Sequence, residues 1–272
     1  MPLYEIVPNL SEGRDATTID AAAAAVERGG ARLIDRSSDD VHHRSVLTVV
    51  GDEAQLLDAA VALAGIALER IDLRGHSGVH PRIGSLDVLP FVPLRGADLA
   101  GAAALAHRAG AEIWRRYHIP SFYYGAAAKQ NERRLLPDVR RNTGWVPDEG
   151  DVLRHESAGA IAIGAREILI AFNIELATGD LAAVRAIART IRERDGGLRS
   201  LRALAMPRAP GCVQVSLNVT DYRATPLYRI VELVARLAAR HDIKIVRCEL
   251  VGCLPWEAVE ASAAYYLGVT KL

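Results

Sequence analysis

The chain has 272 residues, more than the roughly 100–150 residues of the commonest single domain, so the sequence allows one large domain or two packed lobes. Lysine and arginine together number 33, as do aspartate and glutamate, so the formal net charge is zero. With no excess of positive charge to neutralise a phosphate backbone, the composition argues against nucleic acid as a partner and favours a small ligand held in a pocket.

The cysteines and the apolar runs indicate the compartment. The chain has three cysteines, Cys212, Cys248 and Cys253. This odd number, without CxxC spacing, predicts neither a disulfide framework nor a zinc knuckle. The first ten residues show no basic segment followed by an apolar one, so we expect no export signal. No apolar run approaches the roughly 18 residues that a membrane span needs. We therefore expect a cytoplasmic protein without a membrane partner.

The first part of the chain predicts strands and helices in the order βαββαβ. The period of its apolar residues and its turn signals define the elements. We expect strands at residues 4–7, 31–35, 43–50 and 85–92, helices at 17–27 and 52–70, and a polar hairpin turn at 37–40. A further helix at 97–116 and a short aromatic strand at 121–124 follow.

Periodicity disappears between residues 125 and 159, where the sequence is charged and contains proline and glycine. Such a stretch is too long for a plain connector in a compact domain and is usually functional or mobile. Beyond it the order βαββαβ returns. We expect strands at 167–176, 201–206, 212–219 and 243–250 and helices at 180–194, 226–240 and 257–266.

The repeated element order predicts the fold class. We expect an α+β protein of two ferredoxin-like βαββαβ lobes, residues 1–165 and 166–272, each an open sheet with helices on one face. We also expect the lobes to pack together and form a cleft or tunnel. The two lobes share no obvious sequence identity, so this prediction depends on element order alone.

Residues 74–82 hold two histidines, His76 and His80, four positions apart. On a helix this spacing would suggest metal ligation, but the glycines and the proline of the segment predict a loop. From the residues alone, a structural or exposed histidine, acid/base catalysis and metal binding are all open. His80 is favoured over His76 for proton transfer because Pro81 restricts its backbone and Arg82 supplies a positive charge.

The segment that begins at His80 resembles the HPRxGxxDVxPFxPxxG motif of glutamate formimidoyltransferases. Further resemblances follow in the same order and cover nearly the whole chain. They are VPNLSEG at 7–13, HRSV at 43–46, YG at 124–125, WVPD at 145–148, AGA at 158–160, GAR at 164–166, LIAFNI at 169–174, QVS at 214–216, TDY at 220–222 and LVG at 250–252. Residues 1–165 and 166–272 then resemble the N-terminal and C-terminal formiminotransferase subdomains of a shortened bacterial-type member without the cyclodeaminase domain.

The resemblance implies an activity. It implies transfer of a formimino group from N-formimino-L-glutamate to N5 of tetrahydrofolate, a co-substrate, in a late step of histidine degradation, with no metal. The histidine of the family's HPR motif is the catalytic acid or base, and it maps onto His80. Proton transfer at a reacting nitrogen is chemistry that one imidazole can perform. Small-molecule substrates are the implied partners, and alanine-rich helix faces permit a homodimer.

The resemblance also places a folate-binding loop at residues 150–159. Gly150, His155, Ser157 and Gly159 are the candidate binding residues of this loop. Arg44, Arg82 and Arg166 are further candidates for the carboxylates of glutamate or of the folate tail, because guanidinium pairs with carboxylate in two-pronged fashion. The alternative for each arginine is a surface ion pair.

Two departures from the family pattern keep other functions open. Ala126 stands where the family has an acidic residue after Tyr-Gly, and a stretch of the length of a helical hairpin or long loop is missing before Trp145. One alternative is a diverged one-carbon, amidine or formyl transferase with another donor or acceptor. Another is a non-catalytic relative that binds folate or an amino acid. Assistance to His80 from His76, His42 or His43 is also open.

Overall fold

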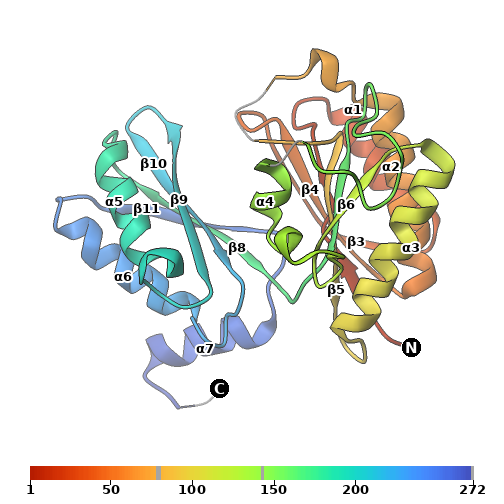
Figure 1. Cartoon of the computed structure of the whole chain (residues 1–272). Helices are drawn as coiled ribbons and strands as arrows, with labels where there is room; N and C mark the ends of the chain where they lie inside the picture. The colour runs from red at the N-terminus through yellow and green to blue at the C-terminus, as the bar shows by residue number, and fades with distance from the viewer. Residues whose placement is uncertain (78–80, 142–143, 271–272) are drawn as a thin grey trace. The chain divides into compact units, whose positions relative to one another are not determined.

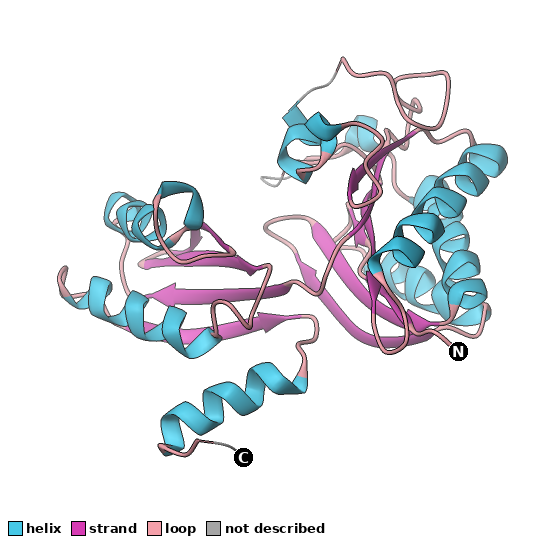
Figure 2. Cartoon of the chain, turned by 60° about the horizontal axis from the view of Figure 1, so that its bottom comes forward, coloured by secondary structure: helices cyan, strands magenta, loops and turns pink. Residues whose placement is uncertain are grey.

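The computed structural model describes residues 1–77, 81–141 and 144–270. Contacts divide the chain into two compact units, Met1–Glu167 and Ile168–Leu272. Each unit has its own sheet and its own helices, as Figures 1 and 2 show. The protein is therefore an α+β protein with two sheets, as the element order predicts.

The first sheet is built around one interrupted strand. Its two pieces, β1 (Tyr4–Ile6) and β2 (Asn9–Leu10), both run antiparallel to β4 (Arg44–Gly51) on one side and to β5 (Leu86–Pro93) on the other. The proline between the two pieces has no N–H to give to the ladder, which accounts for the interruption. β3 (Arg32–Asp39) pairs with β4 at the edge.

The hairpin between β3 and β4 differs from the sequence prediction. The expected turn at residues 37–40 is wrong, because β3 continues to Asp39 and the turn occupies residues 40–43. Ser37 and Ser38 pair with Val46 and Ser45 as an edge strand, where polar side chains are tolerated. The turn ends at His43, whose φ is +50°.

Two strands extend this sheet beyond the expected βαββαβ pattern. β7 (Ile161–Ala165) runs parallel to β5, and β6 (Ser121–Gly125) runs parallel to β7. The strand order is therefore β3, β4, β1 with β2, β5, β7, β6. The sequence prediction includes β6 but misses β7. It also begins the next strand at residue 167, although that strand starts at Ile170. The first unit is larger than a plain βαββαβ lobe.

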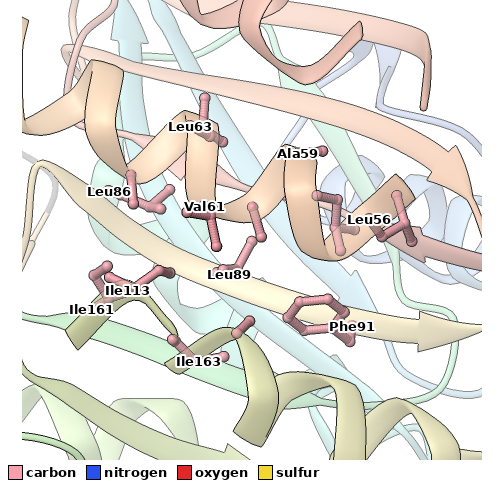
Figure 3. Close-up of a cluster of buried hydrophobic side chains, with 14 of the residues drawn as sticks. Leu56, Ala59, Val61, Leu63, Leu86, Leu89, Phe91, Ile113, Ile161 and Ile163 are labelled. Atoms are coloured by element: carbon pink, nitrogen blue, oxygen red, sulfur yellow. The ribbon is translucent and has the colours of Figure 1, made fainter. Parts of the chain in front are cut away.

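Three long helices cover one face of the first sheet. They are α1 (Ala16–Arg28), α2 (Glu53–Arg70) and α3 (Leu99–Tyr117), and each begins after an aspartate whose side chain accepts a backbone N–H of the first turn. Figure 3 shows Leu56 and Leu63 of α2, Leu89 and Phe91 of β5, and Ile163 of β7 in the core between helices and sheet. All five side chains are fully buried.

A short helix covers the opposite face, so the expectation of helices on one face only is wrong for this unit. Val139 of α4 (Leu136–Arg141) packs with Val88 of β5 and with Phe122 and Tyr124 of β6 in a second apolar group. Figure 1 shows α4 and α3 on opposite sides of the sheet. Strands buried on both faces are typical of parallel pairing.

The aperiodic stretch before β7 is anchored by a buried ion pair. Arg133, in the short 3-10 helix Asn131–Arg133, lies 2.8 Å from Asp148, and both side chains are 3% exposed. Asp148 also accepts the N–H of Tyr123 at 2.8 Å, and the Arg133 guanidinium lies 5.0 Å from the Trp145 ring. The Trp-Val-Pro-Asp motif therefore fixes this stretch to β6.

The second unit has a four-stranded antiparallel sheet in the order β11, β8, β10, β9. Its chain order is βαββαβ followed by a terminal helix, as predicted. The elements are β8 (Ile170–Leu176), α5 (Leu181–Ile191), β9 (Leu201–Ala209), β10 (Cys212–Val219), α6 (Leu227–Ala239), β11 (Ile245–Val251) and α7 (Trp256–Leu267). Alternate residues of β10, from Val213 to Val219, join the core with α5 and α6.

Candidate functional site

The predicted catalytic residue, His80, lies outside the described residues. The described residues nearest to it in the sequence, including His76 and Arg82, belong to a polar group on the first unit. The 3-10 helix Leu73–Gly75 precedes His76, and a backbone bridge at Gly84 follows Arg82.

Arg82 joins this segment to the β3–β4 turn. Its Nη2 donates to the carbonyl of His42 at 3.0 Å, and its Nη1 donates to the carbonyl of His43 at 3.3 Å. Nη1 also lies 2.9 and 2.8 Å from the two ring nitrogens of His76. The structure therefore brings His42, His43 and His76 together around one of the predicted carboxylate-binding arginines.

The imidazole rings of His43 and His76 contact each other in a tilted arrangement. Their ring centroids are 4.1 Å apart. The N–H of Gly13 donates to His43 Nδ1 at 3.1 Å, which places the proton of a neutral His43 ring on Nε2. Gly13 is required here, because a Cβ atom would lie 2.2 Å from the carbonyl oxygen of Asp39.

Burial lowers the pKa of both imidazoles below the ordinary value. For His43, burial is the largest cause, and Glu12 opposes it. For His76, burial is again the largest cause, and the positive charge of Arg82 is the next. Both rings are therefore neutral at pH 7 and able to accept a proton.

The free energy of unfolding is expected to fall as the pH is lowered below 6.5, the ordinary pKa of histidine. Because both pKa values are lower in the folded protein, the unfolded chain binds more protons in the interval between the folded and unfolded values. The stabilisation is thus complete above the unfolded value and is lost as the pH falls through the folded one. Denaturant unfolding above and below this interval measures the loss.

His76→Asn is expected to make this pH dependence shallower, because one of the two shifted groups is gone. His241→Asn, at an exposed position of the second unit, serves as the control and leaves the dependence unchanged. The same slope in the wild type and in His76→Asn would contradict the assignment.

A second polar group lies on the α4 side of the first sheet. Asp87 of β5 is 3% exposed at its side chain, and its Oδ1 accepts the N–H of Ile83 at 2.7 Å. Its Oδ2 lies 2.5 Å from Nη2 of Arg140 on α4 and 3.4 Å from Nη1 of Arg44 on β4. Arg44 also donates through Nε to the side-chain oxygen of Asn9 at 2.9 Å.

The electrostatics of this group extend to Tyr124 and Arg166. Burial lowers the pKa of Arg44 to about 10, Asp87 opposes the shift, and the charges of Arg140 and Arg82 add to it. Burial raises the pKa of Tyr124, and the positive charges of Arg166 and Arg140 oppose that rise. We call Asp87, Arg44, Arg140, Tyr124 and Arg166 the Asp87 cluster.

The predicted folate-binding loop forms a tight turn at its end. His155 and Gly159 exchange backbone hydrogen bonds of 2.7 and 3.0 Å, and Nδ1 of His155 accepts the N–H groups of Ser157 and Ala158 at 3.3 and 3.2 Å. The structure thus brings His155, Ser157 and Gly159 together. Gly150 is placed apart from them, because its nearest neighbours are Pro120 and Trp114.

This turn is hydrogen-bonded to the segment that follows Arg82. The N–H of Ser85 donates to the carbonyl of Ala158, and the N–H of Ala160 donates to the carbonyl of Ile83, both at 2.9 Å. Gly159 has a φ of +71°, and a Cβ atom there would lie 2.2 Å from the carbonyl oxygen of Ile83. Glycine is therefore required at 159 by the backbone, whatever ligand the loop binds.

Sequence reasoning missed Arg140 and the contact between the rings of His43 and His76. Arg140 lies in the aperiodic stretch, 53 residues from Asp87, and no spacing rule connects the two. Among the described residues, no group of three or more histidine, cysteine, aspartate or glutamate side chains could hold a metal ion. No helix in the described part of the chain is long and apolar enough to cross a membrane.

Comparison with known proteins gives consistent matches along the chain. The model of the formiminotransferase domain, N-terminal subdomain, matches residues 3–166, and the model of the formiminotransferase domain matches residues 171–272. A glutamate formimidoyltransferase from Thermoplasma acidophilum is 38% identical over 98% of this chain and 93% of its own length. The protein of the same name from Streptococcus pyogenes is 35% identical over 98% of this chain and 94% of its own length.

A longer relative also matches. The formimidoyltransferase-cyclodeaminase of Rattus norvegicus is 34% identical over 99% of this chain, but the match covers only 53% of that protein. The chain therefore spans about half the length of this relative.

Proposed function

Because the chain belongs to the formiminotransferase family, we propose that it transfers a formimino group from N-formimino-L-glutamate to N5 of tetrahydrofolate. The observation that carries the proposal is the match to two proteins named glutamate formimidoyltransferase, over more than nine-tenths of both lengths. The sequence motifs support it, since the segment from His80 to Val88 follows the family's pattern.

The reaction requires two proton movements. The N5 amine attacks the amidine carbon of the donor, and a tetrahedral adduct forms. N5 must lose a proton, and the nitrogen of the departing glutamate must gain one as its bond to that carbon breaks. One imidazole at position 80, acting first as base and then as acid, would serve both steps. We propose His80 for this role.

Described residues of the first unit have proposed roles in binding the substrates. Arg44, Arg82 and Arg166 would hold substrate carboxylates, and Arg82 would also keep the β3–β4 turn beside the segment that bears His80. Gly150, His155, Ser157 and Gly159 would form the folate-binding loop. The hydrogen bonds between Ser85 and Ala158 and between Ala160 and Ile83 support a common site, because they join that loop to the catalytic segment.

We also propose a ferredoxin-like arrangement for the second unit. The strand order β11, β8, β10, β9, with antiparallel pairing throughout and two helices in the core, supports it. In the first unit, the same arrangement would describe only the part from β1 to β5.

The proposed function is tested by incubating the purified chain with N-formimino-L-glutamate and tetrahydrofolate. We expect release of glutamate and formation of formiminotetrahydrofolate in equal amounts, both measured by mass spectrometry. Tetrahydrofolate alone is expected to raise the melting temperature, because a ligand that binds only the folded state stabilises it. Stabilisation without turnover would contradict the proposal and indicate a non-catalytic folate-binding relative.

One observation favours a second candidate. Ala126 stands in place of the acidic residue of the family pattern, and it is exposed at the end of β6. A transferase that uses another amine acceptor or a formyl donor would not need the carboxylate that is missing at this position. Turnover with N-formyl-L-glutamate, or with an acceptor other than tetrahydrofolate, at a higher rate than with the expected pair would support this candidate.

A further inference from the structure

β11 is an edge strand of the second sheet. It pairs with β8 on one side, and on its other side it has no strand partner among the described residues. An unpaired edge offers backbone N–H and C=O groups to another chain, and proteins usually protect such an edge with charge, proline or cover. β11 contains no proline, and Val246 and Leu250 are 57% and 40% exposed, so this edge is open to a partner.

The sequence of β11 is complementary to itself. Cys248 stands in the middle of the strand, with Arg247 before it and Glu249 after it. When two copies of β11 pair antiparallel with their Cys248 residues opposite each other, Arg247 of each copy lies opposite Glu249 of the other. Opposite charges at directly facing positions stabilise an antiparallel pair, and two-fold symmetry gives this contact twice.

The charged side chains of β11 are already held at the surface of their own sheet. Nε and Nη2 of Arg247 donate to the carboxylate of Glu175 at 2.9 and 2.7 Å, and Asn173 donates to Glu249 at 3.0 Å. The Arg247 side chain is nevertheless 56% exposed, so a carboxylate from outside the sheet can also reach it. Because both side chains are ordered beforehand, pairing costs them little further conformational entropy.

Exposed apolar side chains of the second unit gather on β11 and α7. Except for Leu204, all large apolar side chains that are exposed in the described part of this unit belong to these two elements or to Val269, which follows α7. On α7 they include Trp256, which is 73% exposed, and Leu267, which is 67% exposed. Apolar side chains gathered on a protein surface mark an interaction site.

α7 lies close to the middle of β11. Its Tyr265 ring stacks on Tyr228 of α6, with ring centroids 4.1 Å apart. Burial is the largest cause that raises the pKa of the adjacent Tyr266, Glu232 is the next, and the Cys248 thiol also contributes. Because such an effect falls off with distance, the end of α7 lies beside Cys248. A second copy at β11 therefore meets α7 too, which adds the area that one strand edge lacks for an interface of about 1,200–2,000 Å².

We propose that β11 and α7 form the surface through which two copies of this chain associate, with β11 of one copy antiparallel to β11 of the other. The two four-stranded sheets then form one continuous sheet, with Cys248 of both copies at the two-fold axis. The inference does not depend on the proposed function, because it uses none of the residues proposed for catalysis or substrate binding.

Charge reversal tests the pairing. Glu249→Arg places arginines opposite each other in a pair of identical copies, and Arg247→Glu places glutamates opposite each other. Each variant alone is expected to have a dimer Kd about tenfold or more above that of the wild type, measured by sedimentation velocity. An equimolar mixture of the two variants is expected to form the dimer again, because every facing pair in the mixed dimer has opposite charges.

Glu193→Arg is the matched control, since it reverses the charge of an exposed glutamate of the same unit outside β11 and α7. It is expected to associate as the wild type does. Melting temperatures show whether each variant is folded, which matters for Arg247→Glu because it loses its pair with Glu175. A wild-type chain that stays monomeric across the micromolar range would overturn the proposal. So would a mixture of folded variants that associates no more than each variant alone.

A disulfide tests the register without any charge variant. In the double variant Cys212→Ser with Cys253→Ser, Cys248 is the remaining thiol. Facing Cα atoms of an antiparallel pair are about 4.5–5.5 Å apart, which a disulfide can span. Diamide is expected to give a covalent dimer at alkaline pH, which is needed because burial raises the pKa of the Cys248 thiol.

Adding Cys248→Ser to the same double variant is expected to abolish the covalent dimer. If the wild type is dimeric but Cys248 forms no disulfide between copies, another surface makes the contact and the proposal is wrong.

Discussion

Replacing His80 with alanine is expected to lower the turnover of formimino transfer by about 10²–10⁴-fold, the range that positioned acid/base groups contribute. Without the imidazole, the proton lost from N5 and the proton gained by the departing glutamate must both pass through water. The expected change is in kcat, because the substrates would be held by other residues. Steady-state kinetics at saturating substrate concentrations measure it.

The control for this variant is His241→Ala, which removes an exposed histidine of the second unit. It should keep wild-type turnover. Unfolding of His80→Ala by denaturant should give the same midpoint as the wild type, which separates loss of chemistry from loss of structure. A folded His80→Ala variant with full turnover would eliminate the proposed role.

Replacing Asp148 with alanine is expected to lower the free energy of unfolding by about 3–5 kcal/mol, because it leaves a buried guanidinium without a counterion. Arg133 and Asp148 are each 3% exposed at the side chain, so water cannot substitute for the lost carboxylate. The backbone N–H of Tyr123 loses its side-chain acceptor as well. Equilibrium denaturation monitored by tryptophan fluorescence measures the change, with Trp145 beside the pair as reporter.

Two variants make this expectation specific. Glu156→Ala removes a carboxylate that is 81% exposed and pairs with Arg74, and we expect no measurable change in stability. The double variant Arg133→Met with Asp148→Leu is expected to recover the part of the loss that comes from the unpaired guanidinium, since apolar residues can replace a buried ion pair. The N–H of Tyr123 remains without its side-chain acceptor in this variant. A single variant as stable as the wild type would show that the pair does not fix the stretch before β7.

The fold of the second unit was predictable because its signals are local. Val213, Val215 and Leu217 alternate with polar residues on β10, and apolar residues recur at helical spacing on α6. β7 of the first unit gave no such signal. Its sequence, Ile-Ala-Ile-Gly-Ala, is short, and the strand is buried on both faces, so it shows no alternation. Whether these residues form a strand depends on their pairing with β5 and β6 rather than on a pattern in their own sequence.

The candidate site was predictable only in part, for a related reason. The segment from His80 to Val88 and the glycines of the loop at 150–159 stand out as motifs. A motif does not show whether a residue binds a ligand or allows a particular backbone conformation. Gly159 is an example, because its positive φ requires glycine for the backbone alone. Arg140 carries no local signal, because its proximity to Asp87 arises from the packing of α4 on the sheet.

The position of β7 in the first sheet has a consequence for the nascent chain. β7 is the last strand of its unit to be synthesised, yet it lies between β5 and β6, which leave the ribosome earlier. Until Ala165 has emerged, β6 lacks its pairing with β7, and the aromatic residues of β6 lack part of their cover. Assembly of the first unit is therefore completed by a non-local strand insertion, a class of event that slows folding and lengthens the exposure of unpaired edges.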